Sequence, residues 1–322
     1  MRAVQFSEYG PADVLHLVEV EAPHAGPGEI RISVRASGVT PSDTYVRSGM
    51  LREQVPLPLP HTPGYDAAGV VDEIGDGVTG VSLGDEVFGT TAMARLGGAN
   101  AEHAVLVAWA TKPTAWSWEE AGGAAGNVET ATRVLDRLDV RAGHTLLVHG
   151  AAGGVGTIAI QLAVARGATV IGTASEHNHE LLRSLGATPT TYGPGMVGRV
   201  SALAPRGVDA AFDCAGGALP DLIAITGDRA HVVTIADFGA AAHGVHMSHT
   251  APGSEASAMV GSPADPMALH GLGIAATLAD EGRLRVPVAA SFPLSEATAA
   301  HLLSESRRAR GKIVLLSQPV AH

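Results

Sequence analysis

The sequence holds a single cysteine, Cys214, among its 322 residues. One cysteine excludes an internal disulfide and any multi-cysteine zinc site. Basic residues are also scarce, with 21 lysines and arginines against 32 acidic residues and a formal net charge of -11. Because nucleic-acid phosphates need a basic face, this balance argues against a nucleic acid as partner.

Long hydrophobic runs are missing as well. A membrane-spanning helix needs about 18 or more consecutive apolar residues, and the sequence contains no such run. Residues 1–17 lack the apolar core and cleavage site of a signal peptide, so we expect a cytoplasmic protein with no membrane partner. The length suits two domains rather than one.

Residues 1–117 have the pattern of β-strands. GEIRISVRASG at 28–38 alternates apolar and polar residues, which predicts a half-buried strand. GVVDEIGDGVTGVSLGDEVFG at 69–89 consists of short apolar pieces between glycines, which indicates a curved antiparallel sheet. From about residue 284 the pattern reads strand, helix, strand, and we expect this segment to complete the first domain.

Residues 118–283 alternate between strand and helix patterns. We expect helices at 155–166 and 177–185, and strands at 145–149, 169–174, 209–215, 231–236 and 257–261. Such alternation with apolar strands is typical of a parallel sheet covered on both faces. The predicted fold class is therefore α/β, with a doubly wound parallel sheet and a second, mainly antiparallel β domain.

A cluster of glycines, HGAAGGVG at 149–156, lies where the first of these strands meets its helix. Residues without a β-carbon permit a tight turn there and let a pyrophosphate approach the backbone and the helix N-terminus. Ala151 replaces the first glycine of the dinucleotide fingerprint, which Gly153 and Gly156 complete. The pattern predicts a dinucleotide site, and the alternative is a tight turn in a sheet that binds no cofactor.

The end of the second strand bears on which dinucleotide binds. An acid at this point commonly holds the ribose hydroxyls of NAD, but here the strand ends in Gly172-Thr173-Ala174-Ser175. These small neutral residues leave room for a 2'-phosphate, and His177 and Asn178 follow as polar donors. Glu176 either repels that phosphate or points to solvent. We therefore favour NADPH as cofactor.

Five segments together resemble the medium-chain dehydrogenase/reductase superfamily, specifically its zinc-independent quinone oxidoreductase (zeta-crystallin-like) branch. They are GVTPSDTYVRSG (38–49), PHTPGYDAAGVV (60–71), GVTGVSLGDEVFG (77–89), VHGAAGGVGTIAIQLA (148–163) and ARGKIVLL (309–316). The resemblance covers nearly the whole chain. It implies a GroES-like catalytic domain at residues 1–117 and 284–322, and a Rossmann cofactor-binding domain at 118–283.

The resemblance also bears on metals. Zinc-dependent members of the superfamily carry a cysteine in the first segment and Gly-His-Glu in the second, whereas this chain has Ser42-Asp43 and Gly64-Tyr65-Asp66. We therefore expect no catalytic metal. His243, His246 and His249 recur every three residues, but Gly244 lies among them and no carboxylate is suitably spaced, so we expect no metal there either.

The resemblance implies hydride transfer from NADPH to a small-molecule substrate with an electron-poor double bond, in a quinone, an enone or a 2-alkenal. It assigns Tyr45 to the nicotinamide side as a catalytic residue, with Ser42 and Arg47 as neighbouring donors. The alternatives are a packing role for Tyr45 at a strand end and an ion-pair role for Arg47. The cofactor contacts that it implies are Thr130, Ala152, Gly153, Gly154, Val155, Ser175, His177, Tyr192, Ala215, Ile235, Ala236 and Lys312.

The sequence departs from the family pattern within the site. Relatives often carry Asn-Pro where this chain has Thr40-Pro41, and a basic residue where it has His177 or Asn178. Two other functions therefore stay open: a non-redox cyclase or isomerase on the same fold, and a non-catalytic NADPH-binding protein. An alanine-rich composition typical of a high-GC bacterium suggests a role in secondary metabolism. Relatives pair through an edge strand of the cofactor domain, so we expect a homodimer.

Cys214 lies within the strand predicted at 209–215. Buried cysteines in strands usually serve as small packing residues, so we expect this thiol to be inert.

Overall fold

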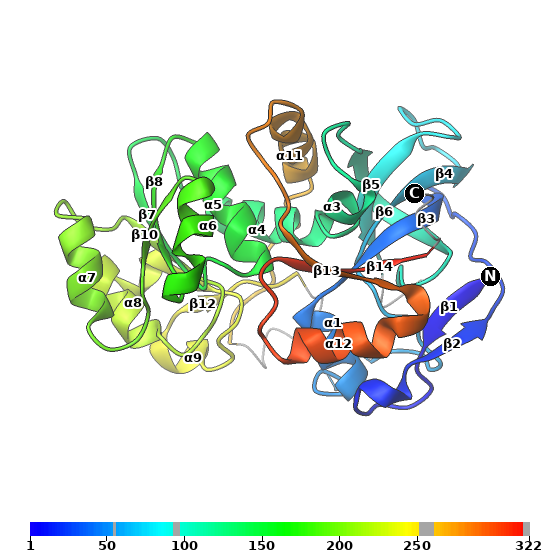
Figure 1. Cartoon of the computed structure of the whole chain (residues 1–322), viewed down its shortest axis with the longest axis horizontal. Coiled ribbons are helices and arrows are strands. Elements are labelled where there is room, and N and C mark those ends of the chain that lie inside the picture. The colour runs from blue at the N-terminus through cyan, green and yellow to red at the C-terminus, as the bar shows by residue number, and fades with distance from the viewer. Residues whose placement is uncertain (54–55, 93–96, 251–260, 318–322) are drawn as a thin grey trace. The chain divides into compact units, whose positions relative to one another are not determined.

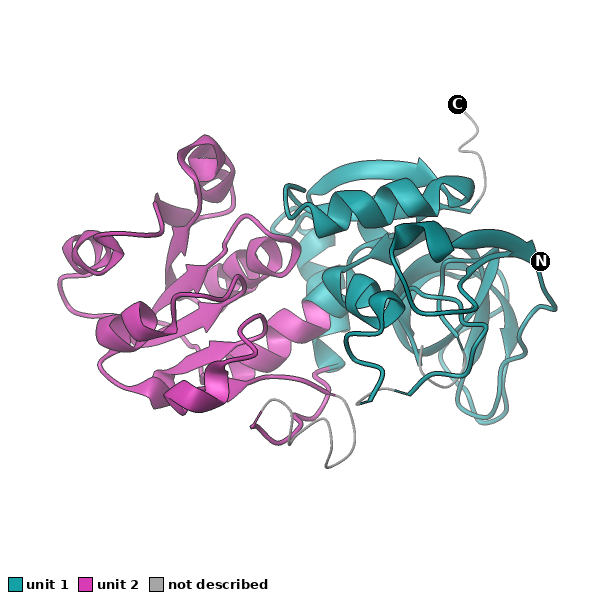
Figure 2. Cartoon of the chain, turned by 90° about the horizontal axis from the view of Figure 1, so that it is seen from below, with its two compact units in different colours: residues 1–127, 269–322 teal, residues 128–268 magenta. Residues whose placement is uncertain are grey.

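The computed structural model describes the chain apart from residues 54–55, 93–96, 251–260 and 318–322 (Figure 1). The chain divides into two compact units (Figure 2). Unit 1 comprises Met1–Asn127 and Leu269–His322, and unit 2 comprises Val128–Ala268. Helix α4 (Ala125–Arg137) runs across the first boundary.

Unit 1 is built on a sheet whose described strands follow the order β13-β14-β3-β4-β5-β6. Strand β3 (Ile30–Val39) also pairs with β6 (His103–Thr111), so β3, β4 (Asp66–Ile74), β5 (Glu86–Thr91) and β6 close into a small antiparallel barrel. Ile30, Ile32 and Val34 are fully buried inside it, which confirms the predicted alternation. The predicted curved antiparallel domain is therefore confirmed.

The C-terminal segment completes this sheet, as predicted. Strand β13 (Val288–Pro293), helix α12 (Ala297–Glu305) and strand β14 (Lys312–Leu316) follow one another, and β14 pairs in parallel with β13 and antiparallel with β3. The other described elements of unit 1 are β1 (Arg2–Gln5), η1 (Ala12–Val14), β2 (His16–Glu19), α1 (Pro41–Ser48), α3 (Trp118–Gly122), α11 (His270–Asp280) and η4 (Leu294–Glu296).

Unit 2 holds a parallel sheet whose described strands follow the order β12-β11-β10-β7-β8-β9. They are β7 (Thr145–His149), β8 (Thr169–Thr173), β9 (Ala187–Thr190), β10 (Ala210–Asp213), β11 (Val232–Thr234) and β12 (His246–Met247). The sequence order reverses between β7 and β10, and in such sheets ligands bind outside the carboxyl ends of the strands at this point. The predicted doubly wound sheet is confirmed, while the strand predicted at 257–261 lies largely outside the described residues.

Helices and short 3-10 turns connect these strands (Figure 1). They are α5 (Gly154–Ala165), η2 (Glu176–Asn178), α6 (His179–Ser184), α7 (Met196–Leu203), α8 (Leu219–Thr226), η3 (Arg229–His231) and α9 (Ala240–His243). The core of unit 2 includes Leu147, Ile171 and Ala211 from three neighbouring strands. Apolar strand interiors thus hold the sheet that carries the glycine turn.

The unit boundaries differ from the predicted boundaries at 117/118 and 283/284. Helix α3 belongs with unit 1 because it packs closely on β3: a β-carbon at Gly122 would lie 2.6 Å from that of Ala36. The start of α4 is tied to β4, since the Gly126 N–H donates to Asp66 Oδ1 at 2.6 Å. Helix α11 joins unit 1 through the Thr114 hydroxyl, which donates to Asp280 at 3.1 Å.

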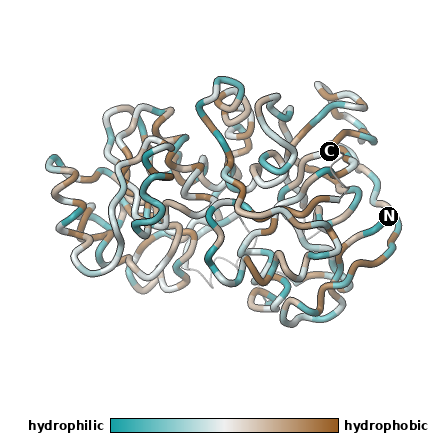
Figure 3. The backbone as a smooth tube through the Cα atoms, in the orientation of Figure 1, coloured by the Kyte–Doolittle hydropathy of each residue, from teal (hydrophilic) through white to brown (hydrophobic). Residues whose placement is uncertain are grey.

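Hydrophobic and hydrophilic residues alternate over short distances along the chain (Figure 3). In the described part of the chain, no helix combines the length and the apolar character needed to cross a membrane.

Candidate cofactor and substrate sites

The glycine turn begins directly after β7. Gly150 has φ +75, a conformation that side chains with a β-carbon rarely adopt, and a β-carbon there would lie 2.8 Å from that of Ala215. A β-carbon at Gly156 would lie 2.6 Å from the Gly150 carbonyl oxygen. Both positions therefore require glycine, and they fold the chain tightly from strand to helix.

The N-terminus of α5 is open. Gly153 is its N-cap and offers no side-chain cap, and the Thr157 N–H donates to the Gly153 carbonyl at 2.9 Å as the first helical bond. The N–H groups of Gly154, Val155 and Gly156 precede this bond and have no partner within the helix. A β-carbon at Gly153 would meet only the Gly150 oxygen, at 3.4 Å, so one side of the turn is free. These features fit a pyrophosphate, which N–H groups and the positive helix end would hold.

A buried polar network supports the carboxyl ends of β7 and β8. His149 Nδ1 lies 2.8 Å from Thr173 Oγ1, and the same hydroxyl accepts the Gly150 N–H at 3.3 Å. Burial lowers the pKa of His149, while the charge of Asp213 acts in the opposite direction. The neutral imidazole thus links the glycine turn to the neighbouring strand.

Asp213 organises the next two loops. Its Oδ1 accepts the N–H groups of Ala215 and Gly216 at 3.0 and 2.8 Å, and its Oδ2 accepts the Thr234 hydroxyl at 2.8 Å. Thr234 Oγ1 in turn accepts the Ala236 N–H at 3.1 Å. The predicted cofactor contacts Ala215, Ile235 and Ala236 therefore lie in loops fixed at the carboxyl edge of the sheet.

The residues after β8 form a polar loop. Ser175 Oγ lies 3.1 Å from His177 Nε2 and accepts Asn178 Nδ2 at 3.2 Å. His179 Nε2 lies 3.3 Å from the Ala174 carbonyl oxygen. The structure therefore brings Ser175 and His177 together beside the strand that adjoins the glycine turn.

Two further predicted cofactor contacts lie elsewhere in unit 2. Thr130 is half-buried on α4, where its hydroxyl lies 3.3 Å from a Glu129 oxygen and from Arg133 Nη2. Tyr192 follows β9 and is exposed, and its carbonyl accepts the Arg199 guanidinium at 3.2 Å. Their cofactor roles stay predictions.

The predicted catalytic segment forms helix α1 in unit 1. Thr40 caps it: the Asp43 N–H donates to Thr40 Oγ1, and the Thr40 N–H donates to Asp43 Oδ2 at 2.7 Å. Pro41 occupies the first helical position, which suits its fixed φ. The alternative that placed Tyr45 at a strand end is therefore wrong. The capping pattern Thr40-Pro41-Ser42-Asp43 is the signal that would have revealed the helix.

Ser42 and Tyr45 both present hydroxyl groups that are not fully buried. Ser42 is exposed and its hydroxyl lies 2.6 Å from Thr40 Oγ1. Tyr45 is half-buried, and its phenol oxygen accepts the Arg307 guanidinium at 3.4 Å. Both hydroxyls are donors that a substrate oxygen could use.

Arg47 has a different environment, because its side chain is only 1% exposed. Its guanidinium forms an ion pair with Glu305 of α12. This is the ion-pair alternative stated for Arg47, and burial keeps the group away from a substrate in solution. We therefore assign Arg47 to holding α1 against α12 rather than to contacting substrate.

Lys312 is also buried. Its Nζ donates to Asp66 Oδ2 at 3.0 Å, and the other oxygen of that carboxylate holds Gly126. In this structure the ammonium group joins β14 to β4, and its cofactor role stays a prediction. Asp43 lies in the same region, and burial raises the pKa of its carboxyl although bonds from Thr40 lower it. Sequence reasoning missed the roles of Asp43, Asp66 and Asp213; the partners of Asp66, Gly126 and Lys312, are distant in sequence.

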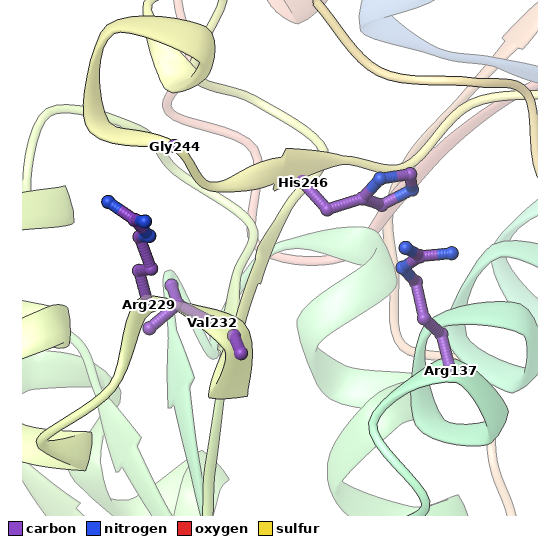
Figure 4. Close-up of a pocket in the computed structure, with 6 residues that line it drawn as sticks. Arg137, Arg229, Val232, Gly244 and His246 are labelled. Atoms are coloured by element: carbon purple, nitrogen blue, oxygen red, sulfur yellow. The ribbon is translucent and has the colours of Figure 1, made fainter.

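A hollow of about 500 Å³ lies at the amino ends of β11 and β12, the edge of the sheet opposite the glycine turn (Figure 4). Arg137 and His246 point toward one another there, and Asp265 binds both, at 2.8 and 3.0 Å. His249 Nε2 lies 3.0 Å from the Ser262 carbonyl oxygen. Among the described residues, no three His, Cys, Asp or Glu side chains are grouped to hold a metal ion.

Cys214 follows β10 instead of lying within it, because that strand ends at Asp213. Its side chain is half-buried. Burial raises the pKa of the thiol well above its usual value, with a further contribution from Asp213. The thiolate is disfavoured, in agreement with the expected packing role.

Two families match the chain. The family described as alcohol dehydrogenase GroES-like domain matches residues 26–135, and the family described as zinc-binding dehydrogenase matches residues 185–315. Together these matches fall on both units.

Curated relatives and solved structures extend the comparison. The quinone oxidoreductase of Rattus norvegicus is 40% identical over 194 residues, 58% of this chain and 57% of its own. The synaptic vesicle membrane protein VAT-1 homolog of the same species is 38% identical over 224 residues, 67% of this chain and 54% of its own. The chain thus spans a little over half the length of these curated relatives.

Solved structures match over almost the full length. An NAD-dependent alcohol dehydrogenase has a TM-score of 0.82 at 30% identity, covering 99% of this chain and 100% of that one. The Escherichia coli quinone oxidoreductase complexed with NADPH has a TM-score of 0.79 at 26% identity, covering 98% of this chain and 100% of that one.

Proposed function

The chain belongs to the medium-chain dehydrogenase/reductase superfamily, in its quinone oxidoreductase branch, and on that premise we propose that it is an NADPH-dependent reductase. The substrate class that we propose is a quinone or an α,β-unsaturated carbonyl. The observation that carries the proposal is the open N-terminus of α5, where glycines leave three N–H groups free for a pyrophosphate.

NADPH would supply the hydride, and the chain would supply binding, orientation and hydrogen-bond donors. The N–H groups of Gly154 and Val155 would hold the pyrophosphate, and the loops fixed by Asp213 would border the nicotinamide ribose. On the substrate side, the Ser42 and Tyr45 hydroxyls would donate to the substrate oxygen as negative charge develops on it. The Arg307 guanidinium, 3.4 Å from the Tyr45 oxygen, favours a phenol that donates outward.

The test follows nicotinamide absorbance over time with NADPH and NADH in parallel, against a panel of quinones and enones. Decay with NADPH on one substrate class is the expected result, and Tyr45→Phe should lower kcat by about 10- to 100-fold if its hydroxyl stabilises the developing charge. Ser48→Ala provides a matched control on the same helix, since its exposed hydroxyl donates to the Tyr45 carbonyl at 3.1 Å. If the nicotinamide absorbance stays constant with every acceptor although NADPH binds tightly, the reductase proposal is wrong.

A second candidate is a protein that binds NADPH without redox turnover, either a cyclase or isomerase or a silent binder. Thr40 in place of the usual asparagine at the substrate end favours it, as does the likeness to a relative named as a vesicle membrane protein. Calorimetry that detects dinucleotide binding, combined with the absorbance assay that detects turnover, separates it from the reductase. This candidate predicts binding without oxidation of the cofactor.

We also propose a homodimer through β12. In the described part of the sheet, β12 has β11 as its neighbour on one side and no strand on the other. Such an edge offers unpaired backbone groups to a second copy. Light scattering coupled to gel filtration would give twice the 32.6 kDa chain mass, and a monomer at all concentrations would contradict the proposal.

A further inference from the structure

We propose that Arg307 binds a carboxylate group of the substrate beside Tyr45, so that the enzyme prefers acceptors that carry a negative charge. The inference rests on the proposed function, because it names the substrate class of the same site. Its observations come from α1, α12 and the loop that follows α12, all of which belong to unit 1.

The Arg307 guanidinium reaches from the end of α12 to the phenol of Tyr45 on α1. Its Nη2 donates to the Tyr45 phenol oxygen at 3.4 Å, and the side chain of Arg307 is exposed. A guanidinium carries five N–H donors in a fixed plane. This contact uses one of them, so most of the donors stay available to a ligand next to the hydroxyl that the proposed reaction uses.

The backbone of Arg307 adopts a conformation that favours glycine. Its φ is +54, in the left-handed region. It directly follows Ser306, the C-cap of α12, and its N–H donates to the Ser304 carbonyl at 3.1 Å. Glycine is the usual residue at this place after a helix. Glycine would close the helix with less strain, so an arginine here points to a role of its side chain.

A buried ion pair holds the two helices together beside this contact. Helices α1 and α12 pack on one another (Figure 1). Arg47 comes two residues after Tyr45, and its buried guanidinium pairs with Glu305. Glu305 in turn comes two residues before Arg307. The contact between Tyr45 and Arg307 is therefore positioned before a ligand arrives, which lowers the cost of binding.

The positive charge of Arg307 lacks an acidic partner among the described residues. Residues 305–310 hold one acid, Glu305, and three arginines, Arg307, Arg308 and Arg310. Glu305 is already paired with the buried Arg47. A carboxylate matches a guanidinium well, because its two oxygens accept two parallel N–H bonds. The chemical group that Arg307 is suited to recognise is therefore a carboxylate on the substrate.

The experiment compares two enones of nearly equal size as acceptors with NADPH: benzalacetone with a carboxylate in the para position, and the methyl ester of the same compound. Steady-state kinetics gives kcat and KM for each. We expect wild type to favour the acid by about tenfold in kcat/KM, roughly the size of one charge-assisted hydrogen bond. Because the carboxylate lies away from the reacting bond, the preference should appear in KM rather than in kcat.

Variants at Arg307 test its charge and its backbone separately. Arg307→Gln should raise KM for the acid by about tenfold and erase the preference. Arg307→Lys keeps the charge without the planar donors and should retain part of it. Arg307→Gly should also lose the preference, although its Tm should be no lower than that of wild type because glycine suits this φ.

Arg308→Gln is the matched control. It removes the neighbouring exposed arginine and changes the net charge by the same amount, so the ratio of acid to ester should stay as in wild type. Equal kcat/KM values for the acid and the ester in wild type would overturn the inference. Equal losses of preference in Arg308→Gln and Arg307→Gln would also overturn it, because the general charge of the loop would then account for the effect.

Failure of the two proposals can be told apart. If wild type reduces both enones with the same kcat/KM, the reductase stands and this inference fails. If neither enone is reduced, calorimetry with the saturated ketones of the same acid and ester, in the presence of NADP+, measures the preference as binding. Tighter binding of the acid by wild type than by Arg307→Gln would then support the role of Arg307 without the reductase, and equal binding would overturn it.

Discussion

The ammonium group of Lys312 on β14 lies 3.0 Å from the carboxylate of Asp66 on β4, and both side chains are at most 5% exposed. The pair joins two segments that are 246 residues apart in the sequence. The same carboxylate accepts the Gly126 N–H at the start of α4. One buried ion pair thus connects three parts of unit 1.

Removing one partner of this ion pair should lower the free energy of unfolding. Lys312→Met leaves a buried carboxylate without its cation, and we expect a loss of about 3–5 kcal/mol in the free energy of unfolding, measured with urea. The double variant Lys312→Met/Asp66→Leu should recover part of that loss. A Lys312→Met protein of native stability that binds NADPH poorly would instead support the cofactor role first predicted for Lys312.

The ion pair between Arg47 and Glu305 should respond unequally to its two removals. Arg47 is buried and Glu305 is 38% exposed. Glu305→Gln strands a buried guanidinium, so we expect a loss of about 2–3 kcal/mol, whereas Arg47→Met returns Glu305 to water and should cost about 1 kcal/mol or less. Chemical unfolding of both variants measures the difference. Equal losses would show that packing, not charge, sets the stability of this contact.

Gly153→Ala should separate cofactor binding from folding. Its β-carbon meets the Gly150 oxygen at an ordinary 3.4 Å, so we expect stability to change by less than about 0.5 kcal/mol while NADPH affinity falls by tenfold or more. Gly198→Ala on α7 is the matched control, since nothing lies within 4 Å of its β-carbon. Calorimetric titration of both variants with NADPH measures the affinities. If Gly153→Ala binds NADPH as tightly as wild type, the glycine turn does not contact the cofactor.

Gly156→Ala, in contrast to Gly153→Ala, should lower the stability of the folded chain. Its β-carbon would lie 2.6 Å from the Gly150 oxygen and 2.8 Å from the Ala151 α-carbon, and neither backbone atom can move cheaply. We expect a loss of about 1–3 kcal/mol, seen as a lower Tm before any cofactor is added. A Tm equal to wild type would show that the turn can widen.

Acid should destabilise the chain through buried histidines. Burial lowers the pKa of His301 to about 3, with a further contribution from Arg47, and burial lowers that of His61 to about 4. A lowered histidine pKa means that the unfolded chain binds more protons, so stability falls as pH decreases from 6.5 toward these values. Between pH 7 and pH 5 each group should cost about 2 kcal/mol.

Variants at His301 test this assignment. Neither ring nitrogen of His301 has a hydrogen-bond partner among the described residues. His301→Leu should therefore keep the stability at pH 7 and lose part of the decline between pH 7 and pH 5, read from urea unfolding at both values. An unchanged pH slope in His301→Leu would assign the decline to other groups.

The positions of strands and helices that depend on local apolar periodicity can be predicted from the sequence. Strand β7 occurs at the predicted residues 145–149, and α5 begins one residue before the predicted 155, because apolar spacing and glycine position define a strand and a helix locally. The return of the C-terminal strand to the first domain followed from the same patterns.

The sequence does not show which distant residues meet. Arg47 lies 258 positions from Glu305, and its burial follows from the packing of α1 on α12 rather than from its neighbours in sequence. Helix α3 and the start of α4 resemble the following domain in pattern, yet the bond from Gly126 to Asp66 attaches them to unit 1. Long-range contacts of this kind decide the domain boundary and the roles of buried charges.

The place of β14 has a consequence for synthesis on the ribosome. This strand lies between β13 and β3, so the sheet of unit 1 stays incomplete until residues 312–316 are translated. All of unit 2 is synthesised before that moment, while residues 36–39 of β3 lack the β14 partners that they have in the folded sheet. An unpaired strand edge is prone to pair with other chains. The nascent first unit therefore presents this part of β3 to other chains until residues 312–316 have been translated.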